Sequence, residues 1–224
     1  MKNNSVPELS QKEIQEVLMK YFPPEEFESI KFSRQQVIFY EKETAEGLYF
    51  ITKGSIKIFV RKKDGREEIL RVVAAPAVIG YKHLLSATKF MTTAIALEQV
   101  EVKMVPREMF LYLVKNNSDL METFLTLLCL DDIERERQLI DFEYKPVRGR
   151  LADALLRLDK LFGSTGSGFI YFSRKEMAGY IGSVRETTTR LISEFRQEKI
   201  IDTSNNRIKI LNRKKLLDIS NLYS

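Results

Sequence analysis

The sequence predicts an α+β chain made of an N-terminal antiparallel β-roll of the jelly-roll type, one long helix, and a C-terminal domain of short helices with a β-hairpin. Residues 47–106 carry short alternating strands, residues 118–143 carry an apolar heptad pattern, and residues 173–195 carry two helix-start signals ten positions apart. We therefore expect a roll domain at 1–117, a dimerisation helix at 118–144 and a helical domain at 145–224.

The N-terminal part alternates apolar and polar residues over short runs. The stretch "GLYFITKGSIKIFVRKKDGREEILRVV" at 47–73 places Ile56, Ile58 and Val60 on one strand face, with Asp64-Gly65 as a hairpin turn. Residues 92–106 continue the alternation. Short strands without long intervening helices are typical of a small barrel or roll. We expect the helix predicted at 11–22 to pack on its outside.

In the predicted long helix, a set of mostly apolar residues recurs at alternating spacings of three and four. This spacing is typical of the seam along which two helices pack in a coiled coil. We expect this seam to join two copies into a homodimer, with Asp132 and Arg135 pairing across it. A second interpretation has the helix cover the roll with Leu120, Phe124 and Leu127, and one helix can do both. The predicted seam consists of Met121, Leu125, Leu128, Asp132, Arg135, Leu139 and Phe142.

Charge is distributed unevenly along the chain. Residues 1–144 carry 20 Lys and Arg against 23 Asp and Glu, whereas residues 145–224 carry 16 against 8, a net charge of +8. A basic C-terminal domain favours a polyanionic partner such as double-stranded DNA. The alternative is a basic face that is only solvated.

The segment "SRKEMAGYIGSVRETTTRLISEF" at 173–195 contains two capping-box patterns, Ser173 with Glu176 and Ser183 with Glu186. Two boxes predict two helices, and Gly182 between them suits a tight turn because glycine tolerates positive φ. A short helix, a tight turn and a second helix form a helix-turn-helix.

The second helix, expected at 184–197, separates into two faces. One face is predicted to pack on the domain and consists of Val184, Thr188, Leu191, Ile192 and Phe195. The other carries groups that suit a DNA groove, since Arg pairs with guanine and Glu accepts from cytosine. The predicted DNA contacts include a phosphate contact by Thr187, and Ser193 also faces outward. The other predicted DNA-binding residues of the two helices are Ser173, Arg185, Glu186, Thr189 and Arg190. The alternative is an ordinary amphipathic helix.

The flanking segments predict a winged form of this motif. The stretch "EKIIDTSNNRIKIL" at 198–211 indicates strand, turn and strand, and "GFIYF" at 168–172 indicates a further short strand. Lys199, Arg207 and Lys209 are expected to contact phosphates. A support helix is predicted over 146–162, and Asn212 is expected to cap a last helix.

The chain as a whole resembles the Crp/Fnr family of bacterial transcription regulators. The resemblance is carried by "LYFITKGSIKIF", "VIGYKHLLSATKFMTTAIALEQVEV", the long helix and "FSRKEMAGYIGSVRETTTRLISEF". Arg185, Glu186 and Arg190 match the recognition helix of the cyclic-AMP receptor branch. The resemblance implies a dimer that reads a palindrome with TGA-containing half-sites and acts by contact with RNA polymerase or by its exclusion.

The sequence departs from the family in its effector pocket. Nucleotide-binding members have Gly-Glu where this chain has Gly80-Tyr81, and Arg-Ser where it has Met91-Thr92. Tyrosine does not replace a ribose-binding carboxylate, and methionine does not replace a cation that pairs with phosphate. Cyclic AMP is therefore not the expected effector. Together with Lys82 and His83, these four residues define the candidate pocket.

Other cofactors are not expected either. An iron–sulfur cluster needs about four cysteine ligands, but Cys129 is the single cysteine and is predicted to be a buried apolar residue. His83 is the single histidine, which argues against haem and against a metal site. Without a signal peptide or a membrane-spanning segment, the chain is expected to be cytoplasmic.

Two classes of function compete with a DNA-binding regulator. A metal enzyme built on the roll would need several histidines and carboxylates, and nucleophilic catalysis would depend entirely on one histidine, so the chain is not expected to be an enzyme. The other class is a winged-helix module that binds protein or RNA without specific DNA readout. Steep salt dependence on double-stranded DNA distinguishes a groove reader from an enzyme.

Overall fold

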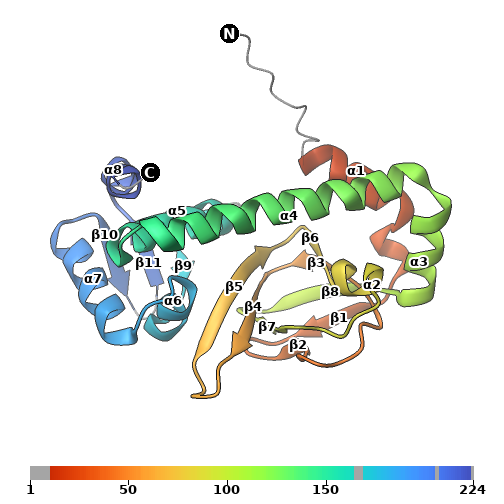
Figure 1. The fold of residues 1–224 in the computed structure, drawn as a ribbon, viewed down its shortest axis with the longest axis horizontal. Coiled ribbons are helices and arrows are strands. Elements are labelled where there is room, and N and C mark those ends of the chain that lie inside the picture. The colour runs from red at the N-terminus through yellow and green to blue at the C-terminus, as the bar shows by residue number, and fades with distance from the viewer. Residues whose placement is uncertain (1–10, 164–168, 205–206, 223–224) are drawn as a thin grey trace, which may run out of the picture.

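The computed structural model describes residues 11–163, 169–204 and 207–222. The roll lies below a long helix and the C-terminal domain lies at one end (Figure 1), so the predicted α+β class and the order of its parts are confirmed. The elements are α1 (Gln11–Tyr21), a 3-10 turn (Pro24–Glu26), β1 (Ser29–Phe32), β2 (Val37–Phe39), β3 (Gly47–Lys53), β4 (Ser55–Arg61), β5 (Glu67–Ala74), β6 (Ala77–Ile79), α2 (Tyr81–Leu85), β7 (Thr93–Ala96), β8 (Val100–Pro106), α3 (Arg107–Asn116), α4 (Ser118–Tyr144), α5 (Val147–Gly163), β9 (Ile170–Tyr171), α6 (Arg174–Tyr180), α7 (Arg185–Gln197), β10 (Ile201–Ser204), β11 (Arg207–Ile210) and α8 (Arg213–Asn221).

The roll consists of two four-stranded antiparallel sheets, in the orders β1-β8-β3-β6 and β2-β7-β4-β5. The predicted β4–β5 hairpin is present, and Gly65 in its turn has a φ of 79°. The expected alternation along β4 is wrong beyond Ile58. A register shift between Ile58 and Phe59 makes Phe59 the next fully buried residue, while Val60 is half-buried.

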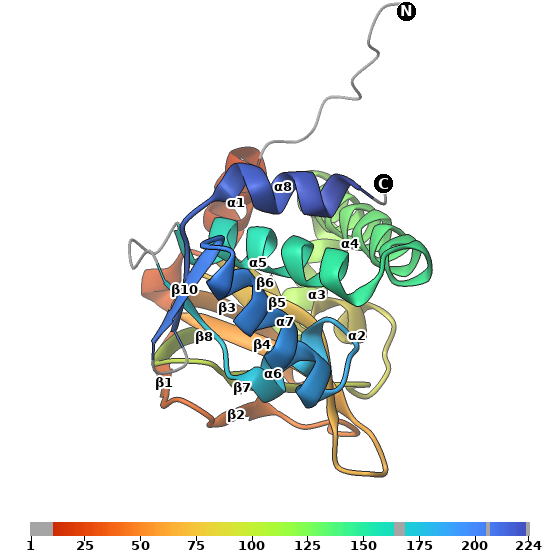
Figure 2. The same ribbon diagram turned by 90° about the vertical axis from the view of Figure 1, so that its left-hand side faces the viewer.

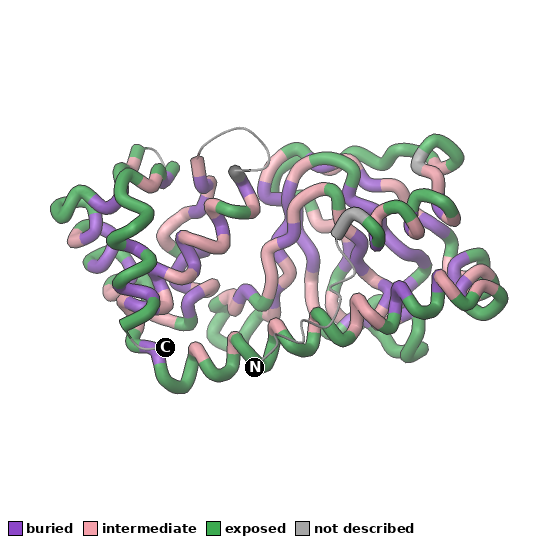
Figure 3. Tube along the Cα trace, turned by 90° about the horizontal axis from the view of Figure 1, so that it is seen from above, coloured by how far each residue is buried: buried purple, intermediate pink, exposed green. Residues whose placement is uncertain are grey.

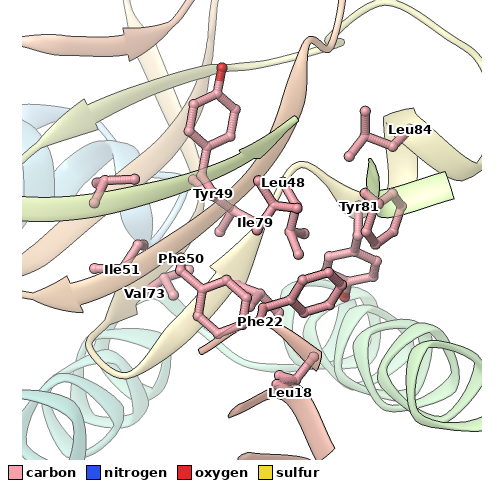
Figure 4. Close-up of a cluster of buried hydrophobic side chains, with 14 of the residues drawn as sticks. Leu18, Phe22, Leu48, Tyr49, Phe50, Ile51, Val73, Ile79, Tyr81 and Leu84 are labelled. Carbon is pink, nitrogen blue, oxygen red and sulfur yellow. The ribbon is translucent and has the colours of Figure 1, made fainter. Parts of the chain in front are cut away.

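The core of the roll lies between its two sheets and extends to the helices that cover them. Phe22, the residue directly after α1, packs against Phe50 and Phe110, with ring centroids 5.9 and 6.3 Å apart. Figure 4 shows Leu18 and Phe22 beside Phe50 and Tyr81 in this cluster. The predicted packing of the first helix on the roll is confirmed.

The long helix α4 has two different sides. Leu120 and Phe124 are fully buried against the roll, which confirms that the helix covers it. On another side, residues of the predicted seam are exposed, with Leu125 at 56% and Leu139 at 70%. The helix ends at Tyr144 because the residue before Pro146 takes an extended conformation.

The C-terminal domain joins α5, α6, α7 and α8 to a three-stranded sheet in the order β10-β11-β9. Figure 3 shows buried residues in both halves of the molecule. The second core is shared between them, because roll residues Phe59 and Ile69 pack in one cluster with Leu155 and Phe195. No helix within the described residues has an apolar stretch long enough to cross a membrane.

Candidate nucleic-acid interface

The first helix of the motif, α6, begins at the predicted capping box. The Ser173 hydroxyl accepts a hydrogen bond from the Glu176 backbone N–H at 3.1 Å, and the Glu176 carboxylate accepts one from the Ser173 backbone N–H at 2.9 Å. Two N–H groups at the helix start are thereby satisfied. This local interaction fixes where α6 begins.

The second predicted capping box does not form. The N-cap of α7 is Val184, which makes no side-chain cap bond and is 46% exposed instead of packed. The turn at Gly182, with a φ of 59°, leaves the Ser183 backbone N–H bonded to the Ala178 carbonyl at 2.9 Å. Ser183 therefore lies one residue too early to cap, and Glu186 is left exposed on the outer face.

Most of the residues predicted to contact DNA lie on the exposed face of α7. Arg185 and Glu186 are exposed and have no hydrogen bond or ion pair from their side chains within the described part of the chain. Arg190 is also exposed and donates to Glu194 at 2.6 Å. Thr189 and Ser193 are exposed and Thr187 is half-buried, while the opposite face buries Thr188, Leu191, Ile192 and Phe195. Figure 2 shows α7 at the end of the molecule that faces the viewer.

The wing is formed by β10 and β11, which pair antiparallel as predicted. Arg207 and Lys209 are exposed at alternate positions, with Ile208 fully buried between them, so both basic side chains lie on the outer face. Lys199 is exposed just before β10. The predicted turn at 205–206 and residue 168 of the predicted strand lie outside the described residues.

Two arginines that the sequence analysis missed lie near this surface. Arg174, the first residue of α6, and Arg196 of α7 line one hollow together with Ser193 and Thr203. Burial and the neighbouring Arg196 guanidinium lower the pKa of Arg174 from its usual value. The two arginines are 22 positions apart, so only the packing of α6 on α7 brings them together. Such a pair suits a phosphate group.

The helix pair is attached to the roll by a buried ion cluster. Lys57 of β4 contacts Glu67 of β5 at 2.8 Å and Glu176 of α6 at 3.2 Å, and the Lys57 and Glu176 side chains are only 3% and 8% exposed. A side chain at Gly179 would place its Cβ 2.3 Å from the Glu67 carbonyl oxygen, so glycine permits α6 to lie directly on β5. Helix α7 is thus connected to the roll through its neighbour α6.

The six residues predicted for the effector pocket all line one cavity. Its volume is about 980 Å³, and its wall includes Gly80, Tyr81, Lys82, His83, Met91 and Thr92. The cavity also reaches α4 and the C-terminal domain through Arg135, Phe142 and Arg150. Tyr81, Lys82 and His83 lie on the short helix α2, which begins directly after Gly80.

One residue of this region was not foreseen. Asp131 of α4 accepts hydrogen bonds on one oxygen, Oδ2, from the Tyr81 hydroxyl at 2.5 Å and from Arg71 at 2.7 Å, and the Lys82 ammonium lies 2.6 Å from the same atom. By contrast, Cys129 is exposed, so the prediction of a buried cysteine is wrong.

Comparison with known proteins decides the family. A cyclic nucleotide-binding domain model matches residues 29–117, and a Crp-like helix-turn-helix domain model matches residues 149–219. The chain belongs to the Crp/Fnr family. As a Crp/Fnr protein it is a DNA-binding transcription regulator and not an enzyme.

Individual relatives agree with this assignment. The chain is 25% identical over 174 residues to the CRP-like cAMP-activated global transcriptional regulator of Mycobacterium tuberculosis, covering 76% of this chain and 78% of that one. It is 29% identical over 185 residues to the global nitrogen regulator of a Nostoc species, covering 80% and 83%. In fold, this Crp/Fnr chain is similar to FixK2 from Bradyrhizobium japonicum, with a TM-score of 0.77 at 21% identity and coverage of 86% and 96%.

Proposed function

We propose that this regulator acts as a homodimer that reads a palindromic DNA site with α7 and that cyclic AMP is not its effector. Residues 1–117, 118–144 and 145–224 then serve as the effector, dimerisation and DNA-binding parts. The observation that carries the proposal is the exposed row of Arg185, Glu186 and Arg190, presented on a helix whose other face is buried. Arginine and glutamate in this position have the donors and acceptors that read guanine and cytosine.

Homodimerisation is supported by the exposed apolar side of α4. The seam side chains Met121, Leu125, Leu139 and Phe142 are each at least 41% exposed in the single chain. A second copy of the same helix is the partner that a heptad seam fits, and a twofold axis would place two recognition helices about 34 Å apart on adjacent major grooves. Leu128, Asp132 and Arg135 complete the proposed interface.

Cyclic AMP is excluded as the effector because the pocket has Tyr81 and Met91 in place of the carboxylate and the cation that would bind it. The Tyr81 hydroxyl is engaged by Asp131, and Met91, which is 72% exposed, supplies no cation for a cyclic phosphate. Burial and the neighbouring Lys82 cation lower the pKa of His83, which faces the same cavity. RNA polymerase is proposed as the partner through which the bound dimer acts, following the family resemblance.

The test is selection of duplex DNA from a random pool by the purified protein at about physiological salt, without added small molecule. We expect enrichment of a palindrome with TGA-containing half-sites. Arg190→Ala is expected to weaken each half-site by about 1–3 kcal/mol and to relax preference at one position, whereas Lys209→Ala is expected to weaken all sequences equally. Unchanged sequence preference in Arg190→Ala would overturn the assignment of α7, and selection of RNA over duplex DNA would favour the alternative module.

A further inference from the structure

Three donors from the roll converge on one carboxylate oxygen. Arg71 comes from β5, Tyr81 and Lys82 come from α2, and all three line the 980 Å³ cavity. Their shared acceptor, Oδ2 of Asp131, comes from α4, 50 residues beyond Tyr81 along the chain. The side chains of Asp131, Lys82 and Arg71 are 16%, 22% and 32% exposed, so the cluster is largely shielded from water.

This arrangement has the composition of an anion-binding site. The Arg71 and Lys82 cations and the Tyr81 hydroxyl all surround the negative charge of the Asp131 carboxylate. Hydrogen bonds of these lengths to a charged group are stronger than those between neutral groups. Burial alone would raise the pKa of Asp131, but Arg71, Lys82 and Tyr81 together hold it below its usual value, so the carboxylate stays charged. The acceptor is thus an anion, and it is supplied by the chain itself.

The cluster also connects α4 to the roll. Leu120 and Phe124 fix the N-terminal half of α4 through apolar contacts, but beyond Leu128 the helix becomes increasingly exposed. Asp131 lies at this transition, where one carboxylate connects α4 to both β5 and α2.

We propose that Arg71, Tyr81 and Lys82 form a carboxylate-binding site that the chain fills with its own Asp131, so that α4 is held in its DNA-binding position without an effector. The chemical class that this site accepts is a small carboxylate. Once the Asp131 side chain is removed, a free carboxylate of similar size is able to bind in its place. The effect on DNA binding rests on the function proposed above, whereas the binding of the carboxylate does not.

The experiment compares Asp131→Ala with Glu136→Ala, a matched control because Glu136 is an exposed carboxylate on the same helix and is not one of the predicted seam residues. Each full-length protein is tested for binding to the selected duplex with sodium acetate or with sodium chloride at equal ionic strength. We expect Asp131→Ala to bind about 5- to 150-fold more weakly, the usual range of coupling between sites, and acetate to restore binding. Glu136→Ala is expected to bind the duplex as the wild type does, and neither protein is expected to bind more tightly in acetate than in chloride.

A thermal-melting series provides a readout that does not need DNA. Acetate is expected to raise the melting temperature of Asp131→Ala relative to chloride, because a ligand that binds only the folded state stabilises it. Asp131→Asn, in which an amide occupies the site, is expected to show weaker DNA binding and no acetate response. It also serves as the test variant should Asp131→Ala not fold.

The outcomes separate the two proposals. Acetate stabilisation of Asp131→Ala in a protein that binds no specific duplex would support the carboxylate site and overturn the proposed readout. Full-strength DNA binding by Asp131→Ala, or weakened binding that acetate changes no more than chloride does, would overturn the carboxylate site. An acetate response in Asp131→Asn equal to that in Asp131→Ala would also overturn it, since the site would then not be where acetate acts.

Discussion

Replacing Lys57 by methionine removes the one cation that lies between Glu67 and Glu176 in the buried cluster. Breaking a buried ion pair by removing one partner typically costs about 3–5 kcal/mol, because a charge stays buried without compensation. Here Glu176 keeps its backbone hydrogen bond from Ser173, and Glu67 keeps Arg61 at 3.2 Å. We therefore expect Lys57→Met to lose folding free energy at the lower end of this range, about 3 kcal/mol, which raises the unfolding equilibrium constant roughly a hundredfold.

The assay is urea denaturation followed by circular dichroism, with Lys62→Met as control. Lys62 pairs with Glu68 in the same hairpin at 2.6 Å, but their side chains are 52% and 37% exposed, so its loss is expected to cost less than about 1 kcal/mol. A loss below about 1 kcal/mol in Lys57→Met, or equal losses in the two variants, would refute the view that this cluster fixes α6 to the roll.

The same cluster predicts a pH dependence. Burial raises the pKa of Glu176, but the hydrogen bonds from Ser173 and the Lys57 charge outweigh it and hold the pKa below its usual value. The stability that Glu176 contributes is therefore complete above its unfolded pKa of about 4.3 and is lost as the pH falls through the lower folded pKa. Without Lys57 the pKa of Glu176 rises, so the stability difference between Lys57→Met and wild type is expected to narrow as the pH falls toward about 4.

Three further outcomes are expected. Gly182→Ala should destabilise the protein by about 2–4 kcal/mol in urea denaturation, because φ is 59° and the new Cβ would lie 2.1 Å from the Phe142 ring. Gly65→Ala, at φ 79° with open space around the new Cβ, should destabilise it by only about 1–2 kcal/mol. Equal losses of stability in the two variants would contradict the role of Phe142. Leu139→Asp should shift sedimentation toward the monomer, whereas Tyr112→Asp, equally exposed on α3, should not. Arg174→Ala should lower the salt slope of DNA binding by about one phosphate contact, and an unchanged slope would exclude it from the interface.

The features that the sequence predicted well depend on neighbours along the chain. The capping box of Ser173 and Glu176 spans four residues, and the end of α4 follows from Pro146 alone. The same local rule failed at Ser183, because the turn at Gly182 bonds the Ser183 backbone N–H to the Ala178 carbonyl and the helix begins one residue later, after Val184. Short-range patterns predict an element but not the residue at which packing makes it begin.

The contacts that the sequence did not reveal join distant segments. Lys57 and Glu176 are 119 positions apart, and Tyr81 and Asp131 are 50 apart. Each of these residues looks like an ordinary surface charge or aromatic in its own segment, and no periodicity marks it. Their burial arises only when β4, α2, α4 and α6 are packed together, so a single sequence carries no signal for the pairings.

The core shared between the roll and the C-terminal domain limits how this protein can be divided or recombined. Phe59 and Ile69 belong to strands of the roll, yet they complete a cluster formed by α5 and α7. A fragment cut at residue 145 would expose this apolar surface on both pieces and would be prone to aggregate. A chimera that joins the DNA-binding half to another roll would also have to include β4 and β5 of this protein. The smallest unit that can be exchanged is therefore larger than the boundary between the two matched domain models suggests.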